Sequence, residues 1–238
     1  MLPGMAIFIP NYADPPGTIT FSTAGTFVWT PPVGFNTMTV QIWGGGGSGG
    51  SGYNGGSTGG GGQGGYYSTW SIPAGSLNLT EQIIVGTGGI HSGYPAAPGG
   101  YSVFGQYASS RGGYGGYGQF YGQQASSVYT PPTSRPFSQT YIENGGDGGL
   151  QGTQSSTYTG ASTAYAGAGG AAAMNDPGNH SGPFTTYGGT SSIGGGNGGG
   201  QSYGGGAQPG TPPGGGGAGY FGAAQANGAS GKIIITWS

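Results

Sequence analysis

A glycine pattern with a period of three fills residues 44–65, which read GGGGSGGSGYNGGSTGGGGQGG. Two of the three columns are almost all glycine, and the third holds small or polar residues, namely Gly45, Ser48, Ser51, Asn54, Ser57, Gly60 and Gln63. Three residues per turn is the period of a polyproline II helix, which has no internal hydrogen bonds. Its N–H and C=O groups therefore need partners in neighbouring helices, and bare glycine columns let the backbones approach. The pattern predicts a bundle of polyglycine II helices, called rods below.

The same period of three recurs in residues 112–120, 144–153 and 195–222. In the first of these segments, an aromatic column contains Tyr114 and Tyr117. We therefore expect several rods that differ in their side chains. In this prediction, the polar column of the opening segment faces water, and the aromatic column packs or binds.

Composition favours order without a conventional core. The chain has 64 Gly and 17 Pro in 238 residues, a level typical of disorder in an aperiodic chain. However, disordered chains are rich in charge and poor in aromatic residues, whereas here 13% are aromatic and the formal net charge is -2. No cysteine is present, so no disulfide framework supports the fold. Backbone hydrogen bonds must contribute much of the stability.

The same composition argues against several partners. Only three residues are basic, so the positive surface of a nucleic-acid-binding protein is missing. No apolar stretch approaches the roughly 18 residues that a membrane-spanning helix needs, and the N-terminal segment lacks a positively charged region and a cleavage site. We expect no nucleic acid, no membrane insertion and no secretion signal.

Short runs of alternating apolar and polar residues predict β-strands, and no segment has helical periodicity. The predicted strands are 18–22, 25–30, 37–43, 66–72, 81–85 and 232–237. We expect the C-terminal strand to return and pair with the N-terminal strands. The predicted fold class is all-β and irregular, with a small β-sandwich formed by the N-terminal strands and the C-terminal strand, packed polyglycine II helices, exposed loops and essentially no α-helix.

The predicted domain organisation has two parts. Residues 1–14 form an N-terminal docking arm, in which Ile7, Phe8 and Ile9 are the apolar contacts; a frayed terminus is the alternative. Residues 15–238 form a single glycine-rich domain. Within that domain, the strands lie in 18–43, 66–85 and 231–237, and the glycine-rich rods and loops lie in 44–65 and 86–230.

No motif in the sequence predicts catalysis. Gly-rich matches to nucleotide-binding fingerprints lack the helix that such a site requires. His91 and His180 lie in similar Ser-Gly contexts without paired carboxylates. The alternative is a pair of carboxylates brought together by the fold, drawn from Glu81, Glu143, Asp147 and Asp176. We expect no enzyme activity, no cofactor and no metal site.

Tyrosine is the residue type that points to recognition, because it gives rigid contact area at low entropic cost. Residues 123–144 and 174–187 are poorer in glycine and are predicted to be exposed loops at rod ends, where binding residues tend to lie. The candidate receptor-binding residues are Tyr129, Arg135, Phe137, Tyr141, His180, Phe184 and Tyr187. The alternative is that tyrosines fill gaps between the rods.

Several motifs, taken in order, resemble one known family. They are GTFVWTPPVG at 25–34, MTVQIWGGGG at 38–47, IIVGTGG at 83–89, GYSVFG at 100–105 and GKIIIT at 231–236. This series is similar to the glycine-rich domain of bacteriophage tail and virion proteins, and to polyglycine-rich tail-fibre adhesins. Residues 120–190 match only in composition.

The resemblance implies a virion structural protein displayed on the particle surface. We expect a tail-fibre or head-fibre adhesin that binds a host cell-surface receptor, a glycan or an outer-membrane protein, through Tyr-rich loops. The arm docks it to other virion proteins, and a homo-oligomer is expected, with a trimer as one option. The alternatives are a capsid decoration or cement protein and, less favoured, an ice-binding polyglycine II protein. A collagen-like triple helix is poorly supported, because residues 44–65 contain no proline.

Overall fold

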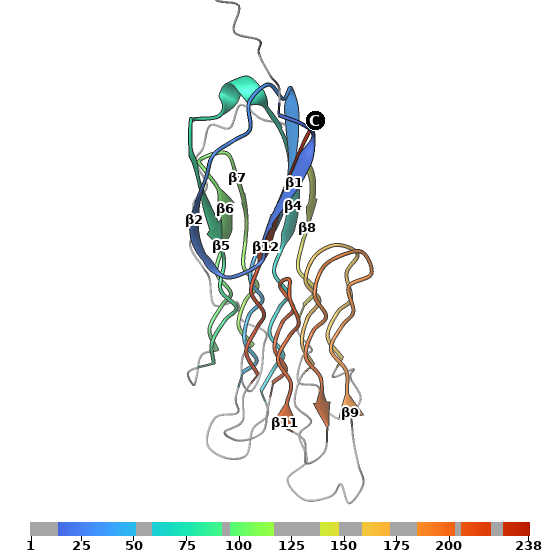
Figure 1. The fold of residues 1–238 in the computed structure, drawn as a ribbon. Helices are drawn as coiled ribbons and strands as arrows, with labels where there is room; N and C mark the ends of the chain where they lie inside the picture. Colours follow the sequence, from blue (N-terminus) through green and yellow to red (C-terminus); the bar gives the residue numbers. More distant parts are fainter. Residues whose placement is uncertain are drawn as a thin grey trace, which may run out of the picture.

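The molecule has a β-sandwich at one end and a bundle of rods at the other (Figure 1). The computed structural model describes residues 14–50, 59–91, 96–116, 139–147, 159–171, 185–202, 206–219 and 226–238. Within these residues the only helix is a single 3-10 turn, η1 (Ala74–Ser76). The prediction of an all-β, irregular fold is confirmed.

The first layer of the sandwich is a five-stranded antiparallel sheet in the order β1-β12-β3-β4-β8. Its strands are β1 (Gly17–Phe21), β3 (Thr37–Trp43), β4 (Tyr67–Pro73), β8 (Gln139–Glu143) and β12 (Lys232–Trp237). The C-terminal strand β12 lies between β1 and β3, pairing Ile235 with both Ile19 and Val40. The predicted return of the C-terminal strand is therefore confirmed.

The second layer is a four-stranded sheet in the order β2-β5-β6-β7. Its strands are β2 (Gly25–Trp29), β5 (Glu81–Val85), β6 (Ser102–Phe104) and β7 (Ala108–Ser110). Alternate side chains of both sheets meet in one apolar core that includes Met38, Ile72, Ile83, Phe104 and Ile233, each at most 1% exposed. Strand periodicity accounts for this core, since side chains on successive residues point to opposite faces.

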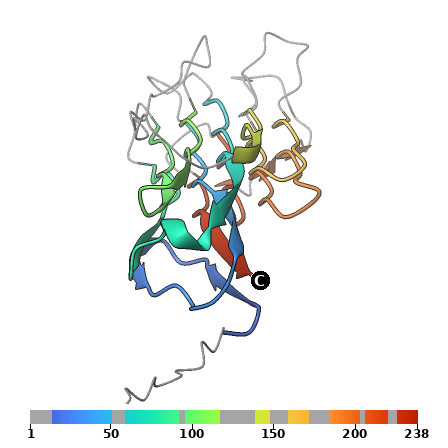
Figure 2. The same ribbon diagram turned by 90° about the horizontal axis from the view of Figure 1, so that it is seen from above.

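The rods continue the strands of the sandwich. Rods 44–50, 86–91, 111–116 and 144–147 follow β3, β5, β7 and β8, and rods 59–66, 96–101 and 226–231 lead into β4, β6 and β12. Figure 1 shows these extended segments running away from the sandwich. Figure 2, viewed from above, shows that they are spread over an area and do not form one flat layer.

Rod 44–50 occupies the centre of the bundle, and its N–H groups point in three directions in turn. Those of Gly44, Gly47 and Gly50 bond to rod 59–66 at N···O distances of 2.8–2.9 Å. Those of residues 45 and 48 bond to rod 96–101, and those of residues 46 and 49 to rod 226–231. A repeat of three in the bonding direction is the period expected of a polyglycine II helix.

The carbonyl groups of the same rod reach further neighbours. Gly45 and Ser48 accept from rod 111–116, Gly46 accepts from rod 86–91, and Gly47 accepts from rod 214–219. A Cβ on Gly47 would lie 1.9 Å from the carbonyl oxygen of Tyr114, so only glycine fits there. Rod 44–50 is therefore surrounded on all sides by hydrogen-bonded backbone.

Two predictions about residues 44–65 are wrong. The segment forms two antiparallel rods, 44–50 and 59–66, and not one. The described polar residues of its third column do not face water, because Ser48 is 0% exposed and Gln63 is 8% exposed. Ser48 Oγ donates to the carbonyl of Ala97, and Gln63 Nε2 donates to Asp147 Oδ1 at 2.9 Å. With neighbours on every side, a central rod has no face left for solvent.

The remaining described rods form three hairpins, with turns at 162–165, 191–194 and 212–214. The predicted rod 195–222 is thereby divided, because residues 196 and 199 bond to residues 213 and 216 of an adjacent rod. Near the end farthest from the sandwich, β9 (Thr185–Thr186), β10 (Gln201–Ser202) and β11 (Gly206–Ala207) form a small antiparallel sheet. Figure 1 places β9 and β11 at that distal end.

Candidate functional site

Four aromatic side chains gather where the five-stranded sheet meets the hairpin turns. We call this group the shoulder cluster; it contains Trp43 of β3, Tyr67 of β4, Tyr141 of β8 and Tyr165 of the turn 162–165. Tyr67 and Tyr165 stack with ring centroids 5.4 Å apart, and Tyr141 meets Tyr165 edge-on at 5.7 Å. Trp43 lies 4.8 Å from Tyr67. Aromatic pairs in such geometries stabilise one another beyond the area they bury.

Local structure explains why these rings meet. Trp43, Tyr67 and Glu143 occupy one row across β3, β4 and β8, so their side chains share a face of the sheet. Trp43 Nε1 donates to the carbonyl of Tyr165 at 2.7 Å, and Gln41 Nε2 donates to the hydroxyl of Tyr67 at 2.9 Å. The cluster is thus fixed by hydrogen bonds as well as by packing.

Glu143 holds the turn against the sheet. Its carboxylate accepts the backbone N–H groups of Ala164, Tyr165 and Ala166 at 2.6–2.9 Å. Consecutive amides converging on one anion form a favourable site, because hydrogen bonds to a charged acceptor are stronger than neutral ones. Here the side chain of Glu143 itself is the bound anion, so its role is structural positioning of Tyr165.

Solvent reaches only part of the shoulder cluster. Trp43 and Tyr67 are buried, Tyr165 is partly exposed and Tyr141 is 43% exposed. Partial desolvation, followed by the negative charge of Glu143, raises the pKa of Tyr141 above its ordinary value of 10.0. On the other side, Lys232 Nζ lies 5.0 Å from the ring centroid of Trp43. The surface offers aromatic contact and hydrogen bonding, and it contains no nucleophile paired with a base.

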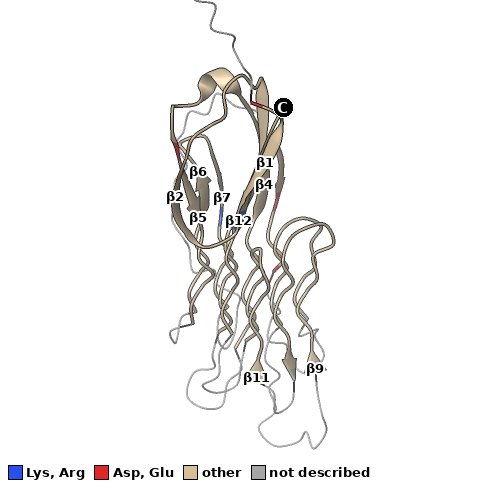
Figure 3. Cartoon of the chain, viewed as in Figure 1, with Lys and Arg blue, Asp and Glu red and all other residues tan. Residues whose placement is uncertain are grey.

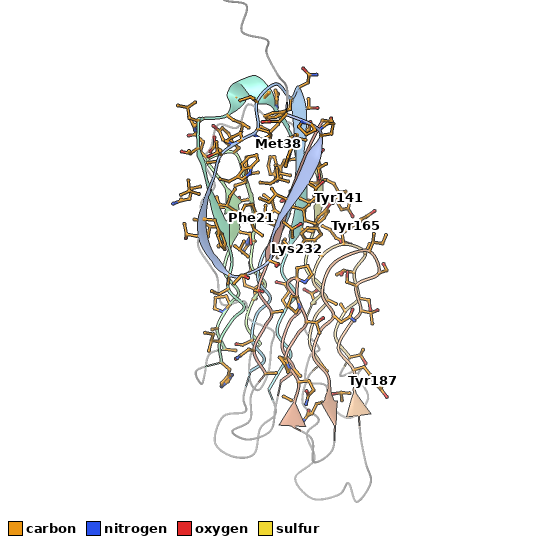
Figure 4. All side chains as sticks on the ribbon, in the orientation of Figure 1. Phe21, Met38, Tyr141, Tyr165, Tyr187 and Lys232 are labelled. Carbon is orange, nitrogen blue, oxygen red and sulfur yellow. The ribbon has the colours of Figure 1, made fainter. Side chains whose placement is uncertain are left out.

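The structure separates the two predicted receptor residues that it describes. Tyr141 lies on β8 at the sandwich, whereas Tyr187 is 67% exposed and follows β9 near the distal end (Figure 4). The prediction that 123–144 is wholly a loop at a rod end is wrong, because residues 139–143 are a strand of the sheet. The other candidates lie outside the described residues: Tyr129, Arg135, Phe137, His180 and Phe184, together with Ile7, Phe8 and Ile9 of the arm.

The described carboxylates do not form a catalytic pair. Glu81 is buried and accepts the backbone N–H of Asn78, Glu143 holds the turn, and Asp147 accepts from Gln63. Asp176 lies outside the described residues. In the part of the chain that the structure describes, no three metal-ligating side chains lie together. Figure 3 shows how sparsely the charges are distributed.

Sequence reasoning missed Glu143 and Tyr165 as organising residues. Each meets partners more than twenty positions away in the sequence, as in the bond from the amide of Tyr165 to Glu143. The only local signal is that Glu143 ends a β run two residues before a glycine pair.

The described part of the chain contains no helix with the length and apolar character needed to span a bilayer.

The fold and these surfaces define a protein without α-helix in its described part, in which a β-sandwich extends into a polyglycine II bundle. Residues 21–238 match the glycine-rich domain family, so the chain belongs to that family. No curated protein matches the sequence. The glycine-rich part of the predicted resemblance is thus confirmed.

Proposed function

We propose that this protein is a bacteriophage virion structural protein that is displayed on the particle surface, attaches by its sandwich end and contacts the host cell with the distal end of its rods. The difference between the two ends of the molecule is the observation that supports this proposal. Asp14, the first described residue, and the C-terminal strand β12 belong to the sandwich, while the described rods extend to the opposite end (Figure 1). The order of the sequence motifs, which resembles phage virion proteins, supports the same assignment.

The sandwich end is suited to attachment. Asp14, the first described residue, is fixed by a pair of contacts with Val33: its N–H donates to the Val33 carbonyl, and its carboxylate accepts the Val33 N–H, both at 2.8 Å. Close by in the fold, Asn36 donates to the carbonyl of Ser238 at 3.2 Å. The predicted docking arm, residues 1–14, therefore ends at a residue that is anchored to the sandwich.

The distal end is suited to recognition. Three pairs of described rods end there, at residues 50 and 59, at residues 91 and 96, and at residues 219 and 226. Backbone hydrogen bonds hold these rods at fixed places in the bundle. Binding residues are commonly carried by loops on a rigid scaffold. Tyr187, at this end, exposes two-thirds of its surface and has the chemistry of a recognition residue. A surface glycan or an outer-membrane protein is the proposed receptor.

Removal of the arm tests the attachment half of the proposal. A variant lacking residues 1–13 is expected to keep its Tm but to be absent from purified particles. A milder variant, in which Ile7, Phe8 and Ile9 are replaced by serine, is expected to be reduced on particles. If the truncated protein is incorporated at the normal copy number, the arm is not the attachment element.

Substitution of Tyr187 tests the recognition half. Tyr187→Ala is expected to slow adsorption of particles to host cells, whereas Val28→Ala, at a 74% exposed position on the sandwich, is expected to leave adsorption unchanged. Equal adsorption by both variants and the parent would argue against distal recognition. Hundreds of copies per particle would instead favour a capsid decoration protein.

A further inference from the structure

Arg111 is held in a cluster of tyrosines on the flank of the rod bundle. It begins rod 111–116 directly below β7, where Figure 3 shows a blue segment. Its guanidinium carbon lies 5.4 Å from the ring centroid of Tyr66 and 5.0 Å from that of Tyr114. Nη2 donates to the Tyr114 hydroxyl, and Tyr101 is close enough to interact electrostatically. We call these four residues the Arg111 cluster.

The charge of Arg111 is not neutralised within the described structure. No salt bridge joins it to a described carboxylate, and its electrostatic partners are the tyrosines. Asp147, whose charge acts on the neighbouring Tyr66, accepts from Gln63. Arg111 Nε is buried and has no acceptor among the described residues. A buried donor without a partner is unusual and points to a missing acceptor.

The geometry limits what that acceptor is. Two tyrosine rings lie 5.0–5.4 Å from the guanidinium carbon and Nη2 donates to Tyr114, so Nε is the buried donor without an acceptor. A guanidinium edge fits the paired oxygens of a carboxylate or a phosphate. Arg111 is already ordered by the two rings and by its bond to Tyr114, so a ligand pays little of the usual cost of ordering a long side chain.

We infer that the Arg111 cluster binds an oxyanion, the carboxylate or phosphate group of an acidic polysaccharide. All four residues of the cluster are partly exposed, so a polymer lying along the flank meets the cluster even though Nε itself is buried. The choice of a polysaccharide as carrier of the anion rests on the proposed contact with a host surface; the oxyanion chemistry does not.

Binding to the purified full-length protein tests the inference. The probes are polygalacturonate, inorganic phosphate and neutral dextran, measured by calorimetry at low salt and again at about 0.15 M ionic strength. We expect polygalacturonate to bind, phosphate to bind more weakly and dextran not to bind. Arg111→Met is expected to weaken polygalacturonate binding by about tenfold or more, as for loss of hydrogen bonds to a charged group.

Two further variants separate a site from general attraction or misfolding. Lys232→Met removes the other described cation, which also lies over an aromatic ring, and is expected to change binding less than twofold. Arg111→Lys keeps the charge but loses the planar fork, so it is expected to weaken binding even if Arg111→Met does not fold.

Equal losses in the Arg111 and Lys232 variants, equal binding of dextran, or no binding of either anion would overturn the inference. Phosphate binding as tight as polygalacturonate binding would overturn the polysaccharide assignment alone. Adsorption to cells is a separate measurement, so the proposed host recognition and the proposed oxyanion site can each be overturned without the other.

Discussion

Glycine is required inside the bundle because of contact, not because of unusual backbone angles. A Cβ on Gly44 or Gly47 would lie 1.8–1.9 Å from a carbonyl oxygen of rod 111–116. These oxygens belong to backbone that is itself hydrogen-bonded, so they have no room to withdraw. At these rod positions, no residue larger than glycine fits.

Gly47→Ala is expected to lower the free energy of unfolding by at least about 3 kcal/mol, since an added methyl group has no space in the centre of the lattice. The matched control is Gly75→Ala in η1, where a Cβ meets nothing within 4 Å and the change should be near neutral. Urea unfolding of both variants measures the difference. Similar values for the two would mean that the central rod is not close-packed.

Tyr107 makes stability depend on alkaline pH. Its hydroxyl accepts from Asn78 Nδ2 at 3.0 Å, and burial, followed by the nearby Glu81 carboxylate, raises its pKa above the ordinary value of 10.0. The unfolded chain therefore loses this proton first, and the stabilisation is complete below pH 10 and decreases as the pH rises toward the folded-state pKa.

We expect Tm to fall as the pH rises above 10, and to fall less steeply in Tyr107→Phe, which has no proton to lose there. The variant should also have a lower Tm at pH 8, because it loses the bond from Asn78. Some slope will remain, since burial also raises the pKa of Tyr66. Identical slopes in the variant and the parent between pH 8 and 11 would contradict this assignment.

At the scale of elements, the sequence patterns predicted the strands better than the turns between rods. The alternation in 37–43, 81–85 and 232–237 matches β3, β5 and β12 to the residue. The period of three correctly indicated rods, but it does not reveal where a rod turns back, because glycine, serine and asparagine suit both a rod and a turn. β6 and β7 were missed, since three residues are too few to show alternation.

The candidate site was less predictable than the fold. Exposure of Tyr141 and Tyr187 agrees with their proposed roles in contact, but Tyr141 lies on a strand that reads as part of a polar loop. Glu143 and Arg111 acquire their roles from partners distant in sequence, such as Ala166 and Tyr66. No local pattern encodes such contacts, which depend on the register of rods and strands.

The turn 162–165 is expected to depend on one carboxylate. Glu143→Gln retains a single acceptor oxygen for three amides, so we expect a loss of about 2 kcal/mol in the free energy of unfolding. Faster hydrogen exchange at residues 164–166 would show that the loss is local. Asp147→Asn, which keeps the oxygen that accepts from Gln63, serves as the control and should cost less than about 1 kcal/mol.

At the scale of the whole molecule, stability is expected to decrease from the centre of the bundle outward. Amides of rod 44–50 are bonded to buried backbone on every side, whereas the amide of Thr190 bonds to an exposed hydroxyl of Ser162. Native-state hydrogen exchange should show the former opening only with global unfolding and the latter by local fluctuation. Equal protection at both places would contradict a graded bundle.

The anchoring of both ends of each distal segment has an evolutionary consequence. Residues 51–58 and 92–95 each connect two rods whose positions are set by other rods and by the sandwich. An insertion or deletion between them leaves the contacts among the described rods in place. We therefore expect related chains to differ in the length and sequence of these short stretches, while the glycine framework that carries them is inherited almost unaltered.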